Sequence, residues 1–164
     1  MNSIQNTISI IASSFLELQA KLQFYEREYL KKKGVIDVTA SEVKVLYIIG
    51  LSNTKSMSDI AAQLKVTKGT LSIAVDSLVK KGYVIRTRNH QDRRIIILYL
   101  TDKALHAVKT YENFYQELLE ALALQDVSQF FTLKEIISRL NHVIEVNFLD
   151  VEAYQPASKE DMQT

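Results

Sequence analysis

The fold of this chain is decided by residues 67–101, TKGTLSIAVDSLVKKGYVIRTRNHQDRRIIILYLT. Thr67 is a typical helix cap, and it begins a helix rich in small residues that Gly82 ends. Residues 83–88 and 94–100 are rich in β-branched and aromatic side chains and flank a short polar loop, so we expect them to pair as a hairpin. A helix followed by such a hairpin and then by another helix predicts a winged helix-turn-helix.

Two capping patterns precede this stretch. Residues 39–42, TASE, form a capping box and predict a helix over residues 43–51. The same pattern at residues 56–59 predicts a short helix that ends at Leu64. Only two residues separate Leu64 from Thr67, so the two helices must turn sharply against each other as a helix-turn-helix.

Long amphipathic helices are expected on both sides of this unit. In the first segment the apolar positions step alternately by 4 and 3, which predicts a helix of roughly 25 residues that ends at the lysines before Gly34. Two more helices are expected after Thr101, separated by a break near residues 125–128. Their combined apolar surface exceeds what the small central unit can cover, which favours a homodimer over a monomeric helix bundle.

The predicted fold class is therefore mainly α with a small β-hairpin wing. We expect a winged helix-turn-helix with long N- and C-terminal dimerisation helices. The expected parts are an N-terminal dimerisation helix (residues 1–38), a DNA-binding domain (39–101), C-terminal dimerisation helices (102–150) and a disordered tail (151–164).

The net charge of +1 conceals two parts of opposite charge. Residues 39–101 hold ten basic and four acidic residues, a net charge of +6, whereas residues 102–164 hold five basic and eleven acidic residues, a net charge of −6. A basic module on an acidic body is the electrostatic footprint of phosphate binding. The charge distribution predicts that double-stranded DNA is the partner of residues 39–101.

The composition argues against several other classes. The chain has no cysteine, which excludes a disulfide framework and a thiolate nucleophile. It shows no export signal and no apolar run long enough to span a membrane, so we expect a cytoplasmic protein. The three histidines are scattered, and no catalytic or phosphate-binding motif occurs. We therefore expect no enzyme activity and no cofactor.

These features together resemble the MarR family of bacterial transcription regulators. Residues 66–72, VTKGTLS, and 75–86, VDSLVKKGYVIR, are similar to the family's recognition-helix run, and residues 92–94, DRR, with 98–101, LYLT, are similar to its wing signature. The similarity extends over about residues 4–149. It implies a homodimeric regulator, in our interpretation a repressor, that binds a palindromic operator and changes its DNA affinity when an effector binds.

The chain departs from the family in both motifs. The family often carries arginines where this chain has Ile73 and Ser77, and a wing proline where it has His90 or a neighbour. Base readout by those arginines is therefore not carried over. The helix and the wing are also similar to regulators of fatty-acid synthesis in Gram-positive cocci, which respond to acyl carrier protein loaded with long acyl chains.

The recognition helix and the wing supply the expected DNA contacts. A helix that enters the major groove needs short or flexible side chains at its start. We expect Lys68 to reach a guanine edge or a phosphate, Thr70 to touch a thymine methyl group, and Ser72 to bind a phosphate. The full predicted set is Thr67, Lys68, Gly69, Thr70, Ser72, Arg86, Arg88, Asp92, Arg93 and Arg94.

The resemblance also assigns roles within the wing. It implies that Asp92 orients an arginine of the loop and that Arg93 or Arg94 enters the narrow minor groove. The alternative to these implied roles is that the residues form a solvated charged turn.

The effector is less well specified. A pocket is expected where the first helix, the helix over residues 43–51 and the helix after Thr101 meet, and it would suit an apolar small molecule or an acyl group. The candidate lining residues, which would otherwise be ordinary core, are Phe15, Phe24, Tyr25, Tyr47 and Tyr111.

Two other functions stay open. One is a metal-responsive regulator that uses His106 or His142 with Glu112 or Glu145. The other is a winged helix that binds only protein, which salt-sensitive DNA binding would distinguish.

Overall fold

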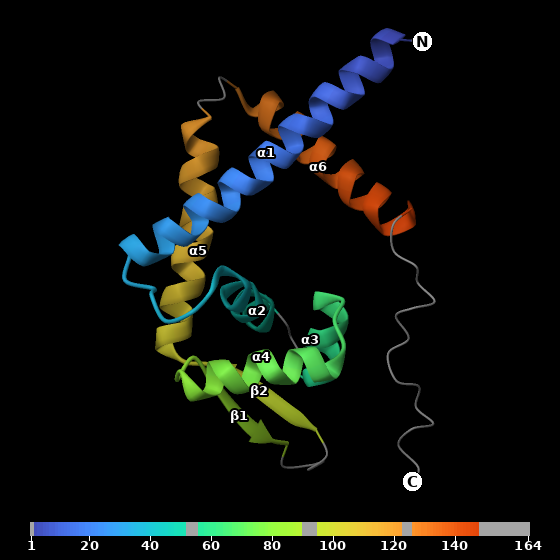
Figure 1. Ribbon diagram of the computed structural model, residues 1–164. Helices are drawn as coiled ribbons and strands as arrows, with labels where there is room; N and C mark the ends of the chain where they lie inside the picture. The colour runs from blue at the N-terminus through green and yellow to red at the C-terminus, as the bar shows by residue number, and fades with distance from the viewer. Residues whose placement is uncertain (1, 52–55, 90–94, 123–125, 148–164) are drawn as a thin grey trace.

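The computed structural model describes residues 2–51, 56–89, 95–122 and 126–147 (Figure 1). The described part is mainly helical with one β-hairpin, as predicted. Its elements in chain order are α1 (Asn2–Lys32), α2 (Ala40–Leu51), α3 (Met57–Leu64), α4 (Lys68–Lys80), β1 (Val84–Arg88), β2 (Ile96–Leu100), α5 (Asp102–Ala121) and α6 (Val127–Asn147). The expected tail, residues 151–164, lies outside the described residues.

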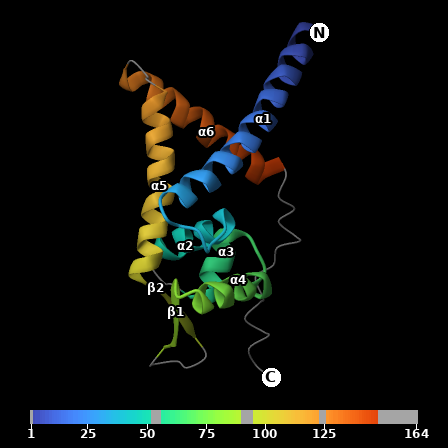
Figure 2. The ribbon, with the colours of Figure 1, turned by 60° about the vertical axis from the view of Figure 1, so that its left-hand side comes forward.

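The molecule has two ends of different character (Figures 1 and 2). Helices α2, α3 and α4 and the hairpin gather at one end and form the winged helix-turn-helix. Helix α5 starts beside the hairpin and leads to the other end, where α1 crosses it and extends outward. Helix α6 turns back from there toward the helix-turn-helix, where Glu145 pairs with Lys65 at 3.2 Å. The predicted fold class, a winged helix-turn-helix with long helices before and after it, is therefore confirmed.

The predicted caps hold the helix starts. Ser56, Thr67 and Thr101 are the N-caps of α3, α4 and α5, and each side chain accepts a hydrogen bond from an amide in the first turn. In the capping box of α2, Thr39 Oγ1 accepts from the Glu42 amide at 3.1 Å, while Glu42 Oε2 accepts from the Thr39 amide at 2.8 Å. The local sequence signals at these four helix starts are confirmed.

Helix α1 is longer than the sequence pattern predicted. It has 31 residues instead of roughly 25, since no proline or glycine interrupts the chain before Gly34. Gly34 has φ +85 and ends the helix in the left-handed conformation, as expected.

The turn between α3 and α4 depends on one residue whose conformation the sequence did not signal. Lys65 is left-handed, with φ 53, although it is not glycine. In this conformation the next amide, that of Val66, donates to Ala61 O at 3.0 Å and satisfies a carbonyl at the end of α3. The chain can then enter α4 within two residues.

The wing is an antiparallel pair whose register runs from Val84 opposite Leu100 to Arg88 opposite Ile96. Each strand begins one or two residues later than predicted. Ser56 forms an additional bridge to Ile97, so the segment before α3 joins the edge of the hairpin. This bridge gives the wing a fixed connection to the helix-turn-helix.

One core holds the central unit together. It is built from α2, α3, α4, the hairpin and α5, together with Leu30 at the end of α1 and Val35 after it. Its fully buried members include Leu46, Ile49, Ile60, Leu71, Val75, Leu78 and Leu98. Helix α6, in contrast, buries none of its side chains, and most of the apolar stripe of α1 is exposed. The apolar surplus that the sequence predicted is therefore present on the single chain. No helix in the described ranges has the length and apolar character needed to cross a membrane.

Candidate nucleic-acid interface

Helix α4 presents its start and one outer face to solvent. Leu71, Val75 and Leu78 point into the core and are essentially inaccessible. Every residue from Thr67 to Thr70 is exposed, and Ile73 one turn later is exposed as well. The predicted contact residues of the helix start are thus brought together on an accessible surface.

Two threonines at this start bind each other. Thr67 Oγ1 accepts from the Thr70 amide at 3.1 Å and lies 2.9 Å from Thr70 Oγ1. Both hydroxyl groups are therefore used within the cap, and the methyl group of Thr70 is the part of that side chain best suited to an outside contact.

Nothing inside the protein requires a glycine at position 69. A Cβ atom built at this position would meet only Thr67 Oγ1, at 3.8 Å, which is ordinary van der Waals distance. Glycine in a helix costs roughly 0.5–1 kcal/mol relative to alanine. The space above Gly69 is therefore open for the close approach of another molecule.

Lys68 and Ser72 differ in exposure. Lys68 is exposed and makes no ion pair with another described residue, so its ammonium group is available to a phosphate or a guanine edge. Ser72 is half-buried, which limits its reach.

The predicted wing arginines have different surroundings. Arg86 is on β1, and its Nη1 lies 2.8 Å from Oδ1 of Asp76 on α4, so it connects the wing to that helix. Its Nε and Nη2 are buried and have no partner among the described residues. Arg88, two residues further along β1, is exposed and makes no ion pair within the described ranges. Residues 92–94, which complete the predicted set, lie outside the described residues.

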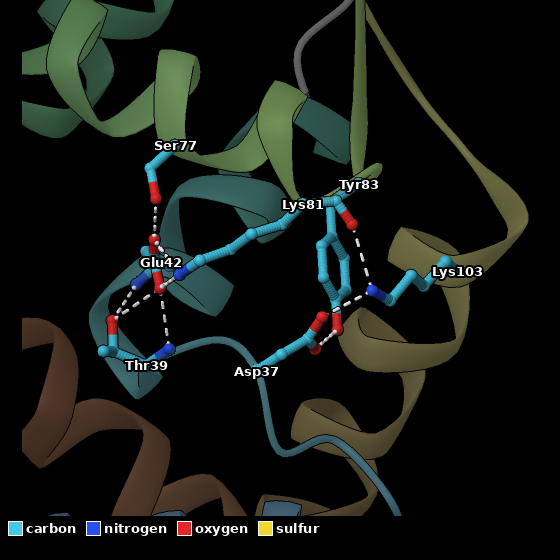
Figure 3. Close-up of polar contacts among 7 residues, drawn as sticks. All are labelled: Asp37, Thr39, Glu42, Ser77, Lys81, Tyr83 and Lys103. Carbon is cyan, nitrogen blue, oxygen red and sulfur yellow. Dashed lines mark hydrogen bonds and ion pairs between the residues drawn. The ribbon is translucent and has the colours of Figure 1, made fainter.

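A half-buried carboxylate, that of Glu42, connects α2 to the C-terminal end of α4 (Figure 3). Glu42 Oε1 accepts from Ser77 Oγ and from Lys81 Nζ, both at 2.8 Å, and Oε2 accepts from the same ammonium group at 2.9 Å. Burial raises the pKa of Glu42, but the hydrogen bonds from Lys81, the Thr39 amide and Ser77 outweigh it, so the pKa is below its ordinary value. The sequence pattern predicted Glu42 only as part of the capping box of α2, and its contacts with Ser77 and Lys81 were not predicted.

A second polar cluster lies beside the first (Figure 3). Asp37 accepts hydrogen bonds from the Tyr83 hydroxyl and from Lys103 Nζ, and Lys103 also donates to Lys81 O at 3.0 Å. The hydrogen bonds from Lys103 and Tyr83 lower the pKa of Asp37, while burial and this carboxylate raise the pKa of Tyr83. The segment before α2 is thereby joined to the base of the wing and to α5.

Two hollows lie along α1 on the side that faces α2. The larger, of about 580 Å³, is lined by residues of α1, the segment that follows it and the start of α2, including Asp37 and Thr39. The smaller, of about 400 Å³, is lined by Phe15, Leu18, Gln19, Leu22, Gln23, Glu26, Lys44 and Tyr115. Gln23, Glu26 and Lys44 line both.

Glu26 is the buried acid of these hollows. It is 1% exposed, its Oε2 accepts from the Tyr115 hydroxyl at 2.6 Å, and its Oε1 has no hydrogen-bond partner among the described residues. Burial and the hydrogen bond to Glu26 raise the pKa of Tyr115. Lys44 Nζ lies 3.8 Å from Oε2.

Only some of the residues predicted to line an effector pocket lie at or near these two hollows. Phe15 lines the smaller hollow. The rings of Tyr47 and Tyr111 lie near each other in a tilted arrangement, and Tyr111 contacts Tyr115, which lines the hollow. Phe24 and Tyr25 are exposed on α1 and line neither hollow. The smaller hollow instead includes Leu18 and Leu22 of α1, which were not among the predicted lining residues.

The histidines and glutamates considered for a metal site do not lie together in the described part of the chain. Across the described ranges, no group of three or more histidine, aspartate or glutamate side chains could hold a metal ion. Glu145 pairs with Lys65 at 3.2 Å, and His106 lies beside the Lys33 carbonyl.

Comparison with known sequences finds one matching family model and several similar transcriptional regulators. Residues 38–96 match the model of the MarR family. The chain is 32% identical over 103 residues to the HTH-type transcriptional repressor MdtR of Bacillus subtilis, a match that spans 63% of this chain and 64% of MdtR. It is 31% identical to the HTH-type transcriptional regulator SarZ of Staphylococcus saprophyticus, over 73% of this chain and 91% of SarZ.

Solved structures share the fold. FabT of Streptococcus pneumoniae in complex with DNA superposes with a TM-score of 0.76 at 22% identity, over 84% of this chain and 97% of that chain. MepR of S. aureus in its DNA complex gives a TM-score of 0.65 at 19% identity, over 80% and 96% of the two chains.

Proposed function

Because the chain belongs to the MarR family of transcriptional regulators, we propose that it represses transcription as a homodimer bound to a palindromic operator in double-stranded DNA. We further propose that it acts in the cytoplasm without enzymatic activity, with a small apolar molecule or an acyl group as its effector.

The observation that carries the DNA-binding proposal is the open start of α4. Thr67, Lys68, Gly69 and Thr70 are exposed together, and the space above Gly69 admits a close neighbour. The positive end of the helix dipole is at this start, and the surrounding residues 39–101 carry a net charge of +6. These are the properties of a helix that enters the major groove.

The homodimer proposal rests on the exposed apolar surfaces of α1 and α6. A single chain leaves apolar residues of both helices in contact with water, at a cost of roughly 25 cal/mol per Å². A second copy covers them and sets two α4 helices at a fixed separation. Two major-groove half-sites one helical turn apart are about 34 Å from centre to centre, so the dimer determines which operators fit.

Selection of binding sequences from a random pool of double-stranded DNA tests the function. The purified chain is used at two salt concentrations, so that loss of counterions is separated from sequence preference. A palindrome supports the proposal. Salt-sensitive binding without a preferred sequence would instead indicate an architectural protein, and absence of binding would favour a winged helix that binds only protein.

The effector proposal rests on the two hollows beside α1. Phe15, Leu18 and Leu22 offer an apolar wall to an acyl chain or a similar ligand. Asp37 and Thr39 line the neighbouring hollow and also take part in the clusters that hold Tyr83 and Glu42. A ligand there would act on the segment that connects α1 to the DNA-binding lobe, and would favour one separation of the two α4 helices.

Titration with saturated fatty acids of increasing length tests this site. Thermal stability and operator affinity are measured together, since a ligand that binds one conformation changes both. A Leu22→Gln variant should lose the response while an Asn141→Gln variant on α6 keeps it. An equal response of the two variants would place the ligand elsewhere.

A further inference from the structure

Ile73 is the most exposed of the large apolar side chains in the described ranges, at 76%. Most of the other exposed apolar residues lie on α1 and α6, the long helices to which we assign the dimer contacts. Ile73 is instead on α4, outside those helices, and its neighbours on the outer face are polar or small. Dimerisation through α1 and α6 gives no reason for its exposure.

The position of Ile73 places it within the proposed DNA-contacting face. It follows Gly69 by four residues and Thr70 by three, so it lies one turn further along the same side of the helix. Because Gly69 has no side chain, Ile73 projects beside an open stretch of backbone. It is therefore the largest side chain of this face in the first two turns, apart from Lys68.

The polar residues further along α4 are directed to partners in the protein. Asp76 pairs with Arg86 of the wing, and Ser77 donates to Glu42. The hydroxyl of Thr70 is engaged with Thr67. Apart from the hydroxyl of the half-buried Ser72, the second and third turns therefore offer the groove few uncommitted hydrogen-bond donors or acceptors. The principal group they present is the hydrocarbon side chain of Ile73.

One base presents a matching surface. In the major groove, guanine, adenine and cytosine display hydrogen-bonding groups, which an isoleucine would desolvate without replacing their bonds, whereas thymine also displays its C5-methyl group. We propose that Ile73 is a specificity-determining residue that selects thymine in each half-site by packing on this methyl group. The inference rests on the proposed function, because it requires α4 to occupy the major groove.

The test removes the methyl group and the isoleucine side chain separately and together. Each thymine of the selected operator is replaced in turn by deoxyuridine, which pairs identically but lacks the methyl group. Affinity is measured for the full chain, for Ile73→Ala and for Val79→Ala. Val79 is the control, since it is an exposed apolar residue nearer the C-terminal end of the same helix. Alanine favours helix and Ile73 is exposed, so the variant should fold; thermal unfolding verifies this.

The expected result is a loss of about fourfold at one symmetry-related thymine per half-site for the full chain and for Val79→Ala. Ile73→Ala should bind more weakly overall and show no further loss at that thymine. The inference is overturned if the losses are equal in all three proteins or if deoxyuridine has no effect at any position. If the full chain selects no operator at all, the proposed function fails first, and that outcome is distinguishable from the other two.

Discussion

The guanidinium of Arg86 and the carboxylate of Asp76 lie 2.8 Å apart and connect the first strand of the wing to α4. The two elements that would contact DNA are thus positioned relative to each other by an ion pair. Asp76 would also bring negative charge close to the phosphates if Arg86 did not balance it. We therefore expect Arg86 to act on DNA binding through the orientation of α4, and the exposed Arg88 to contact DNA directly.

Replacing each of these arginines by alanine should separate the two roles. Arg86→Ala should lower the free energy of unfolding by about 1 kcal/mol, through lost packing and a lost ion pair, and should weaken DNA binding. Arg88→Ala should change the free energy of unfolding by less than about 0.5 kcal/mol. It should also lower the slope of log affinity against log salt concentration by about one, the share of one phosphate contact. Urea unfolding and salt titrations measure both quantities; identical effects of the two variants would refute the assignment.

Gly69→Ala tests whether another molecule uses the space above this residue. The added Cβ meets only Thr67 Oγ1 at 3.8 Å, so stability should be unchanged or rise by up to ~1 kcal/mol. DNA affinity should fall at least tenfold, because the methyl group would stand between the backbone and a base or phosphate. A variant that is equally stable and binds DNA normally would show that α4 does not approach DNA at this turn.

The Glu42–Lys81 ion pair predicts a specific dependence of stability on pH. The pKa of Glu42 is lowered in the folded chain, so its stabilisation is fully present above the unfolded pKa of about 4.5 and is lost as the pH falls through the folded value. Glu42→Gln keeps a side chain that can cap α2 but removes the charge. It should cost roughly 1–2 kcal/mol at pH 7 and less below pH 4.

The control for Glu42→Gln is Glu135→Gln, which removes the same charge from an exposed ion pair with Arg139 on α6. It should have little effect at either pH. Chemical denaturation from pH 3 to pH 7 compares the two variants. A Glu42→Gln deficit that is constant over this range would mean that the carboxylate's charge does not stabilise the fold.

The apolar stripe of α6 is expected to hold the dimer together. Leu140→Glu should convert the dimer to monomers, since it places a charge in the centre of the stripe, and the helix content should remain because α6 buries no side chain against its own chain. Ser138→Glu adds the same charge on the opposite side of the helix. Sedimentation velocity distinguishes the variants, and an intact Leu140→Glu dimer would contradict the assigned interface.

Local features of this fold were predictable from the sequence. The caps at Thr39, Ser56, Thr67 and Thr101 and the glycine at residue 34 act within a few residues, so their patterns are visible in the chain itself. The hairpin was predictable for the same reason. The strands begin slightly later than expected because β-propensity does not define where pairing starts.

Interactions between distant segments were not predictable. Glu42 is 35 residues from Ser77, and nothing local distinguishes a glutamate that only caps a helix from one that also binds another helix. Ser77 and Ile73 both differ from the arginines frequent in the family, but only the structure separates them, with Ser77 turned toward Glu42 and Ile73 toward solvent. The left-handed Lys65 likewise had no signal, because glycine and asparagine are the usual residues in that conformation.

The central claim is that two copies of this chain bind one palindromic DNA site. Fluorescence anisotropy with the selected duplex, compared with a duplex in which one half-site is scrambled, tests it most directly. We predict two protomers per duplex, an affinity that falls steeply with added salt, and a loss on the order of a hundredfold when one half-site is scrambled. Equal affinity for the two duplexes, or binding of one protomer per site, would contradict the account.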